Sequence, residues 1–386
     1  MKDRDYIRKA HSCPADSRKA AQEFHAMVVH PGMALVIFSC PSDYDLEALP
    51  GEMKRLFGDV QVVGCTTAGE IGPAGLRDHS LAGASFPASH FRVAAGQVEQ
   101  LQQFKVEAGQ DFAQALLHKL LAEGPPGDAD HSFALLLIDG LSLREEPVTR
   151  AFQTALGRLP LLGGSAGDGM KFDRTQVYWD GRFGSDCAVL VLVASRMPFR
   201  IFKTQHVVAT DDRLVVTDAD AASRTVKEIN GLPASQEYAR MLGIDASDLD
   251  PSRFAAWPVV LTIGGTTYVR SIQKANADGS LTFFCAIENG LVLRVAKGVD
   301  LLQNLEQAFA GIRAEIGPPQ LVLGYDCILR KLEIAQSSAK DRIGELLQQN
   351  NTVGFHTYGE QFRGVHVNQT LVGIAFGTNG VEASHV

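Results

Sequence analysis

Residues 64–70 read Gly-Cys-Thr-Thr-Ala-Gly-Glu, and residues 354–360, near the other end of the chain, read Gly-Phe-His-Thr-Tyr-Gly-Glu. The likeness extends beyond this motif, because at the same offset Leu81, Gly83 and Phe86 recur as Leu371, Gly373 and Phe376. A recurrence that continues past the motif predicts a duplicated structural unit, and such a repeat constrains the fold more than any single element does. We refer to the two segments as the motifs of copies 1 and 3.

A weaker third motif lies between them, where Ser165, Gly167 and Asp168 repeat the pattern of hydroxyl, glycine and acid. Each copy begins with a short apolar run typical of a buried strand, continues with helical spacing and a second strand that ends in the motif, and closes with another apolar run. The opening runs are 33–39, 133–139 and 320–326, the helical segments are 46–57, 147–156 and 339–349, and the closing runs are 81–86, 187–193 and 371–376. The sequence therefore predicts an α/β fold of mixed α+β character, in which repeated strand-helix-strand-loop-strand units form mixed sheets flanked by helices.

The chain length of 386 residues suits two domains. We expect an N-terminal helical extension over 1–24, a first domain over 25–221 that holds copies 1 and 2, and a second over 222–386 that holds copy 3. Within the middle of the chain the pattern predicts a hairpin turn at Asp211-Asp212, a helix over 221–229 and strands at 259–263, 267–272 and 281–287. A helix over 301–314 leads into copy 3.

Composition excludes several classes of function. The formal net charge of −8 and pI near 5.8 argue against nucleic acid and against an anionic membrane surface, because no basic stripe is available. No apolar run approaches the ~18 residues of a membrane span, and the charged N-terminus lacks the apolar core of a secretory signal, so we expect a soluble cytoplasmic protein. The six cysteines are scattered singly, which favours buried reduced thiols over disulfides or a zinc site.

Taken together, the motifs resemble those of FIST sensory proteins, which are built from a FIST_N and a FIST_C domain. The matching elements are 64–70, 138–140, 162–168, 231–234, 324–325, 354–360 and 368–370. The resemblance implies a cytoplasmic ligand-sensing protein of bacterial signal transduction that regulates a histidine kinase or a cyclic-di-GMP enzyme. The chain shows no kinase-like or GGDEF-like region, which fits the stand-alone NosP-type subgroup, whose members resemble haem-based nitric oxide sensors.

The motif loops combine hydroxyls, backbone N–H groups and carboxylates, which can bind a small polar ligand. The alternative is structural, since Gly69, Gly167 and Gly359 can supply a tight bend whose hydroxyl and acid cap the backbone. The motif residues that repeat between copies are better explained by a structural role, and those that differ by a functional one. The residues that differ are Cys65, His356, Tyr358 and Arg363. The ligand-binding candidates are Cys65, Thr66, Thr67, Gly69, Glu70, Ser165, Asp168, Thr357, Tyr358, Glu360, Arg363 and Asn368.

Haem b enters through the resemblance alone. The chain lacks Cys-x-x-Cys-His, so a haem would be held non-covalently through an axial side chain. The candidates for the axial ligand are His356, His366 and His206. Each can instead be an ordinary hydrogen-bonded histidine of a strand or loop.

A hydrolase or transferase with Ser165 or Cys65 as nucleophile is the alternative to a sensor. Residues 163–167 fit the Gly-x-Ser-x-Gly elbow, but an elbow serine enters a helix directly, and residues 168–173 are too rich in Gly and Asp to begin one. The same stretch lacks the lysine of a phosphate-binding loop, because Met170 stands at that position. We therefore expect a protein that binds and does not catalyse.

Overall fold

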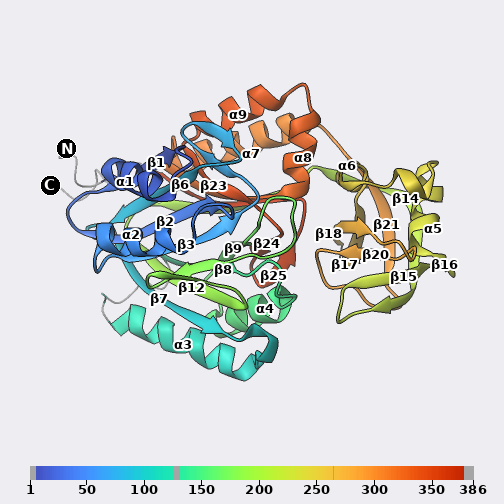
Figure 1. Ribbon diagram of the computed structural model, residues 1–386, viewed down its shortest axis with the longest axis horizontal. Helices are drawn as coiled ribbons and strands as arrows, with labels where there is room; N and C mark the ends of the chain where they lie inside the picture. The colour runs from blue at the N-terminus through green and yellow to red at the C-terminus, as the bar shows by residue number, and fades with distance from the viewer. Residues whose placement is uncertain (1–5, 123, 125–130, 264, 378–386) are drawn as a thin grey trace.

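Three copies of one unit form the larger part of the molecule, which we call the body (Figure 1). The computed structural model describes residues 6–122, 124, 131–263 and 265–377. Copy 1 consists of β2 (Met33–Pro41), α2 (Ala48–Phe57), β3 (Gln61–Thr67), β4 (Glu70–Gly72), β5 (Gly75–Arg77) and β6 (Leu81–Pro87). Copy 2 consists of β8 (Ser132–Ile138), α4 (Glu145–Leu156), β9 (Leu161–Ser165), β10 (Val177–Trp179), β11 (Arg182–Gly184) and β12 (Cys187–Ser195). Copy 3 consists of β22 (Leu321–Cys327), α8 (Ile328–Gln336), α9 (Lys340–Gln349), β23 (Thr352–Thr357), β24 (Glu360–Phe362), β25 (Val365–Val367) and β26 (Leu371–Phe376).

The copies exchange hairpins in a ring. In each copy the first two long strands are parallel and the closing strand is antiparallel to the first. The hairpin that follows each motif leaves its own copy: β4–β5 pairs with β23, β24–β25 with β9, and β10–β11 with β3. Because each motif lies just before an exchanged hairpin, the exchange brings the motif loops to the junctions between copies.

Additional elements complete the three sheets of the body. The edge strands β1 (Arg8–Ser12), β7 (Phe91–Glu99) and β13 (Phe199–Thr204) pair with β6, β12 and β26. Helices α1 (Ser17–Val28), α3 (Val106–Ala122) and α7 (Leu301–Ile316), with the short η1 (Leu101–Gln103), cover the outer faces. The central core lies between the sheets and takes side chains from all three copies, such as Val63, Leu162 and Phe355. The body is therefore one folded unit with a shared core.

Glycines that recur between copies 1 and 3 have a packing role. A Cβ on Gly354 would lie 1.7 Å from the Gly324 carbonyl oxygen, and one on Gly64 would lie 2.6 Å from that of Phe38. On Gly83 it would lie 2.2 Å from the Ile37 oxygen. Neighbouring strands approach too closely at these positions for any side chain, which explains why glycine recurs there.

Residues 207–298 form a second module, which we call the cap. In Figure 1 it lies to the right of the body and faces α8, β25 and α4. It has its own core, which includes Leu214, Tyr238 and Leu293. Its elements are β14 (Val207–Asp220), β15 (Thr225–Ile229), β16 (Leu232–Pro233), α5 (Ala234–Leu242), η3 (Ala246–Asp248), α6 (Pro251–Ala256), β17 (Val259–Ile263), β18 (Thr266–Arg270), β19 (Ile272–Ala275), β20 (Leu281–Phe283) and β21 (Val292–Gly298).

The mixed α/β fold class is confirmed, and local predictions in the cap are partly wrong. The predicted helix over 221–229 is instead a turn followed by β15, because Val226 and Ile229 point into the cap core and the strand pairs with β14. The predicted hairpin at Asp211-Asp212 is a register shift inside the continuous strand β14.

The sheets also group the chain differently from the division at 221/222. Copy 3 shares its sheet with β4, β5 and β13, all of which precede that boundary, while the cap is inserted between β13 and α7. The predicted helical extension over 1–24 contains β1 before α1. The final residues of both termini lie outside the described residues.

Two predictions from composition can be compared with the fold. All six cysteines are free, and five of them are buried, as predicted. Within the described ranges, no helix combines the length and apolar character needed to cross a membrane.

Candidate functional site

The motifs of copies 1 and 3 build the same bend. In copy 1, Thr67 Oγ1 donates to Glu70 Oε1 at 2.5 Å and accepts from the Gly69 N–H at 3.2 Å, while Ser80 donates to Glu70 Oε2 through its N–H and its hydroxyl. Copy 3 repeats every one of these bonds with Thr357, Gly359, Glu360 and Thr370. The backbone at Gly69 has φ +124°, a conformation that favours glycine. The repeated hydroxyl, glycine and acid are therefore the scaffold of the loop.

Both motif glutamates are fully buried, with 0% exposure. Burial raises the pKa of Glu70 to about 7 and that of Glu360 to about 8, although the hydroxyl donors oppose the shift. The neutral acid is thus favoured in the fold well above the usual range of a carboxyl group.

Copy 2 uses its acid differently. Asp168 accepts from the N–H groups of Phe172, Asp173 and Arg174 and from the hydroxyl of Tyr358. The carboxylate therefore organises the longer loop of copy 2 and ties it to the motif of copy 3. Tyr358, which has no counterpart in copy 1, owes its position to this contact.

The three motif loops contact one another in sequence around the body. The Ala68 N–H donates to the His356 oxygen at 3.0 Å, the Gly167 N–H to the Thr66 oxygen at 2.9 Å, and the Ser165 N–H to the Gly359 oxygen at 2.8 Å. The cap lies over this junction, where its Ala255 and Phe284 pack in one apolar cluster with Ala68, Cys327 and Tyr358. The loops are thus covered and not open to solvent.

Beside this apolar contact lies a group of buried polar side chains with atoms that have no hydrogen-bond partner among the described residues. We call it the polar cluster; its members are Arg270, Ser271, Gln361, His366, Asn368 and Gln369. Both amide atoms of Asn368 lack a partner, and its side chain lies beside Gly359. Gln369 Nε2 donates to the Ala255 oxygen of the cap at 2.8 Å, and Gln369 Oε1 has no hydrogen-bond partner among the described residues. Buried polar atoms are normally paired, so such a concentration indicates a site for water or ligand.

His366 contributes a defined donor to the polar cluster. Its Nδ1 lies 3.2 Å from Gln361 Nε2, which can only donate, so Nδ1 accepts and the proton of the neutral ring is on Nε2. Burial lowers the pKa of His366 to about 4, which keeps the ring neutral. The Nε2–H faces the Phe284 carbonyl without the geometry of a hydrogen bond.

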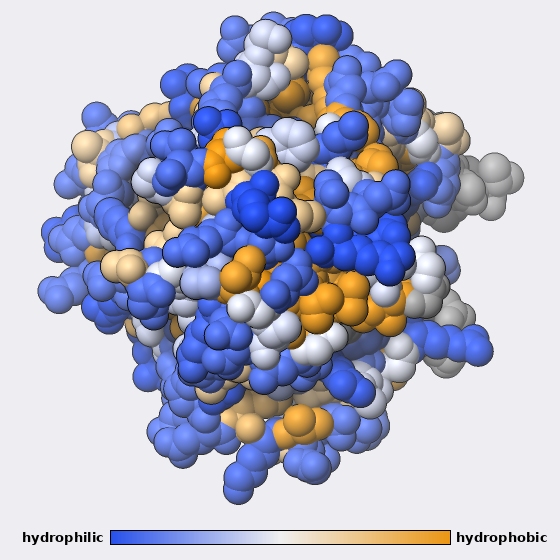
Figure 2. Space-filling model, turned by 90° about the vertical axis from the view of Figure 1, so that its right-hand side faces the viewer, coloured by the Kyte–Doolittle hydropathy of each residue, from blue (hydrophilic) through white to orange (hydrophobic). Residues whose placement is uncertain are grey.

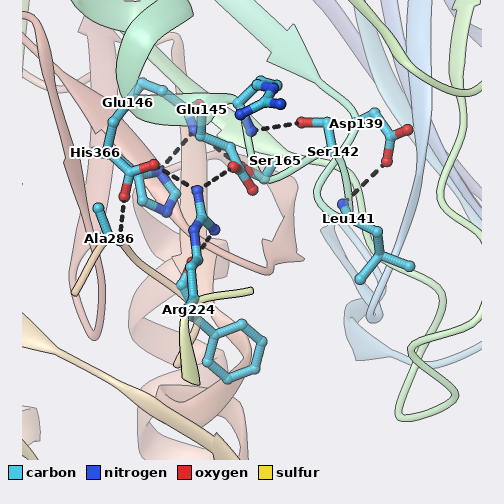
Figure 3. Close-up of polar contacts among 12 residues, drawn as sticks. Asp139, Leu141, Ser142, Glu145, Glu146, Ser165, Arg224, Ala286 and His366 are labelled. Atoms are coloured by element: carbon cyan, nitrogen blue, oxygen red, sulfur yellow. Dashed lines mark hydrogen bonds and ion pairs between the residues drawn. The ribbon is translucent and has the colours of Figure 1, made fainter. Parts of the chain in front are cut away.

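A buried ionic clamp holds the cap next to the polar cluster (Figure 3). Arg224 of the cap donates to Glu145 Oε2 at 2.6 Å and to Glu146 Oε2 at 2.5 Å, both at the start of α4. The Ala286 N–H of the cap donates to Glu146 Oε1 at 2.6 Å. Although burial acts to raise it, the charge of Arg224 helps to hold the pKa of Glu146 below its usual value. The clamp therefore joins the cap and α4 in one electrostatic unit.

The structure brings most of the predicted residues to the loop junction, with exceptions. Cys65 lies in the central core, where burial raises its pKa well above the usual range. Arg363 is exposed at the tip of the β24–β25 hairpin, where it lies over the Phe362 ring. His206 lies where the chain enters the cap. The junction residues are Thr66, Thr67, Gly69, Glu70, Ser165, Asp168, Thr357, Tyr358, Glu360 and Asn368.

The residues that the sequence did not reveal come mainly from the cap and α4. Arg224, Arg270 and Ser271 lie far from the motifs in sequence, and Glu145 and Glu146 resemble an ordinary acidic first turn of a helix. Gln361 follows the repeated glutamate directly, and its counterpart in copy 1 is the apolar Ile71. That break in the repeat was the one available signal.

Haem does not fit at the three histidines as they stand. Both ring nitrogens of His206 are engaged, Nε2 by Glu333 and Nδ1 by Arg330. His366 packs against Gly359 so closely that a Cβ there would lie 2.6 Å from its Nε2. His356 borders a pocket of about 90 Å³, far below the several hundred Å³ of sites for drug-sized ligands. Among the described residues, no group of three or more His, Cys, Asp or Glu is placed to hold a metal ion.

Ser165 does not have the surroundings of a nucleophile. Its hydroxyl is fully buried and accepts from Gln361 Nε2 at 2.9 Å. Throughout the described part of the chain, no histidine or carboxylate hydrogen-bonds to it, so the base that a serine nucleophile needs is missing from this arrangement.

The comparisons with known proteins identify the family. Residues 34–232 match the FIST N domain and residues 234–363 the FIST C domain, so the chain belongs to the FIST family. FIST domains are associated with sensory signal transduction and bind small ligands. An uncharacterized protein of Methanocaldococcus jannaschii is 24% identical over 242 residues, which are 61% of this chain and 46% of that protein. A crystal structure of cyanuric acid hydrolase from A. caulinodans aligns over 97% of this chain and 99% of that one, at 10% identity and a TM-score of 0.39.

Proposed function

We propose that this protein senses a small polar molecule that binds in the polar cluster between cap and body, and that it acts by binding and not by catalysis. The observation that supports the proposal is the set of buried, unpartnered atoms on Gln361, His366 and Asn368 next to the motif of copy 3. A purely structural role would leave these atoms paired, because each unpartnered buried group costs about 1–3 kcal/mol.

The free atoms define the kind of ligand. His366 Nε2 and Asn368 Nδ2 are donors, while Gln361 Oε1, Asn368 Oδ1 and Gln369 Oε1 are acceptors. The nearby charge of Arg224 is balanced by Glu145 and Glu146. A small, polar ligand that presents both donors and acceptors would satisfy the site without adding a buried net charge.

Binding there requires the cap to move, because the cluster is closed to solvent. A ligand can shift the position of the cap only by binding one position more tightly than another. Figure 2, which views the molecule from the side of the cap, shows apolar side chains among polar ones on this face. The exposed apolar residues of the cap include Val208, Leu232, Ile263 and Val292. Regulation of a histidine kinase or a cyclic-di-GMP enzyme, a cytoplasmic location and a bacterial setting stay predictions.

Haem-based nitric oxide sensing also stays a prediction, and it requires a rearrangement around one of the three histidines. An absorption spectrum of protein reconstituted with haem is the test. A Soret band that responds to nitric oxide and is lost on replacement of His356, His366 or His206 by alanine supports it. Absence of any such band removes it and leaves the proposal for a polar ligand unchanged.

Replacing Asn368 with leucine should separate ligand binding from folding. Leucine has a similar size and removes two unpartnered polar atoms, so the unliganded variant should be more stable than the wild type by about 1 kcal/mol or more. A thermal-shift screen with small polar metabolites should find a compound that raises the Tm of the wild type and not that of Asn368→Leu. At 100 times Kd the expected stabilisation is about 2.7 kcal/mol.

The matched control is Asn289→Leu, at an exposed asparagine of the cap, which should keep the response. A destabilised Asn368→Leu protein would show that the amide is structurally required, and an equal response of both variants would place the ligand elsewhere.

A further inference from the structure

A separate pocket of about 90 Å³ lies outside the polar cluster, at the junction between copies 1 and 3. Arg77, the last residue of β5, and Asp78, which follows it, form one wall. Lys331 of α8 and Lys340 at the start of α9 form the other. His356 of β23 also lines it. The pocket exists because the β4–β5 hairpin of copy 1 is exchanged onto the sheet of copy 3.

The charges around this pocket are predominantly positive. Arg77, Lys331 and Lys340 face a single carboxylate of the lining, Asp78. Lys331 bridges that carboxylate and the Ala68 oxygen of the copy 1 motif, the latter at 2.7 Å. Two cations are thus left in excess at the rim, and clefts with one sign of charge concentrate ligands of the opposite sign.

The floor of the pocket carries an unsatisfied polar group. His356 is 1% exposed, and within the described chain neither of its ring nitrogens makes a hydrogen bond. Nδ1 lies 3.4 Å from Asp326 Oδ2, close enough for the carboxylate to attract an Nδ1–H, and Asp326 accepts from Arg330 Nε at 2.5 Å. Copy 1 has Thr66 at this register position, and its hydroxyl accepts from the Gln176 N–H, so the free imidazole is specific to copy 3.

The size of the pocket limits the ligand. At about 30 Å³ per water in the liquid, a volume of about 90 Å³ corresponds to roughly three waters. A molecule of a few heavy atoms fits, whereas a nucleotide does not.

We propose that this pocket binds a small anion of the carboxylate or phosphate class, with His356 donating through Nε2 as the doubly protonated imidazolium and Lys331 and Lys340 donating from the rim. This site is distinct from the polar cluster and does not depend on the function proposed above. Asp326 behind His356 orients the ring, because its carboxylate attracts the Nδ1–H and leaves Nε2 to face the ligand.

Polar contacts lead from this pocket to the connection between body and cap. Asp326 binds Arg330, and Arg330 Nη1 lies 2.8 Å from His206 Nδ1. The carbonyl of His206 accepts from the Val299 N–H at 2.7 Å. This bond links the segment that enters the cap to the segment that leaves it. An anion that accepts from Nε2 shares the imidazolium charge with Asp326, so we expect its binding to alter these contacts as far as the cap connection.

Calorimetric titration with inorganic phosphate and, separately, with acetate tests the binding at constant ionic strength. We expect saturable binding of at least one anion, weakened more than about tenfold by His356→Gln and about three- to fivefold by Lys340→Gln. Lys119→Gln, at an exposed lysine of the remote helix α3, should bind like the wild type. The anion that binds distinguishes a phosphate from a carboxylate ligand.

Three results would overturn the proposal: no saturable binding of either anion, an equal effect of sodium chloride at the same ionic strength, or wild-type affinity in His356→Gln. Asn368→Leu should keep the anion affinity, so failure here and failure of the polar cluster are separate results. Hydrogen exchange at residues 205–209 and 297–300 should change at saturating anion. Binding without that change would disprove the transmission to the cap.

Discussion

Replacing Arg224 with methionine should lower the free energy of unfolding by about 3–5 kcal/mol and loosen the cap. The substitution removes the partner of two carboxylates at the start of α4, of which Glu145 is 1% exposed. An uncompensated buried charge costs about this much, whereas a complete ion pair adds little net stability. Urea unfolding measures the loss, and faster hydrogen exchange at residues 284–287 would show that it arises at the contact between cap and body.

Two further variants make this result specific. Arg213→Met removes an exposed arginine from the same module and should change stability by less than about 0.5 kcal/mol. Adding Glu145→Gln and Glu146→Gln to Arg224→Met should restore part of the stability, since no buried charge then lacks a partner. If Arg224→Met alone is as stable as the wild type, the clamp does not hold the cap.

Raising the pH from 6.5 to 8 should lower stability through the two motif glutamates. The folded pKa of Glu360 is about 8 and that of Glu70 about 7, while an unfolded glutamate has its pKa near 4.5. Over this interval the unfolded state has released the proton and the folded state still holds it, so each group lowers stability by about 1.4 kcal/mol per pH unit until its folded pKa is passed. Together they contribute a loss of about 2–3 kcal/mol.

The interval is chosen because the histidines with lowered pKa values act below it. Glu145, whose pKa is raised to about 7 by burial, acts within it in the same direction as the motif glutamates. His11 and His366 have pKa values lowered to about 4, mainly by burial, so their contribution rises with pH up to about 6.5 and then stays constant. Below pH 6.5 the gain in stability from the histidines partly offsets the loss from the glutamates. Above pH 6.5 the contribution of the histidines no longer changes. The glutamate effect is therefore clearest between 6.5 and 8.

The double variant Glu70→Gln and Glu360→Gln should show a flatter profile over this range, because glutamine mimics the neutral acid and does not titrate. The control is Glu52→Gln: the hydrogen bonds from Arg55 and Gln22 lower the pKa of Glu52 to about 2, so both states are ionised throughout. Its profile should parallel that of the wild type. A double variant as pH-sensitive as the wild type would contradict a neutral Glu70 and Glu360.

The repeat was readable from the sequence because its determinants are local. Thr67, Gly69 and Glu70 form hydrogen bonds with one another within four residues, so the same bend requires the same residue types wherever it occurs. Gly64 and Gly354 recur because neighbouring strands leave no space for a side chain. Such requirements produce patterns that sequence comparison within one chain can detect.

Neither the hairpin exchange nor the position of the cap on the body leaves such a local pattern in the sequence. The sequence of β4 does not show that it pairs with β23, since pairing with its own copy would need the same alternation of side chains. Arg224 and Glu145 are 79 residues apart and become partners only through the tertiary fold. The sequence therefore indicated the motif loops, which the structure brings together, and gave no indication of the cap that covers them.

Hydrogen exchange of the wild-type protein with and without the ligand from the metabolite screen tests the central claim most directly. If a small polar molecule binds in the polar cluster, amides of residues 284–287 in the cap and 366–370 in the body should gain protection together. The same compound should leave the exchange of Asn368→Leu unchanged. Protection confined to other segments, or equal protection in Asn368→Leu, would contradict a ligand site between cap and body.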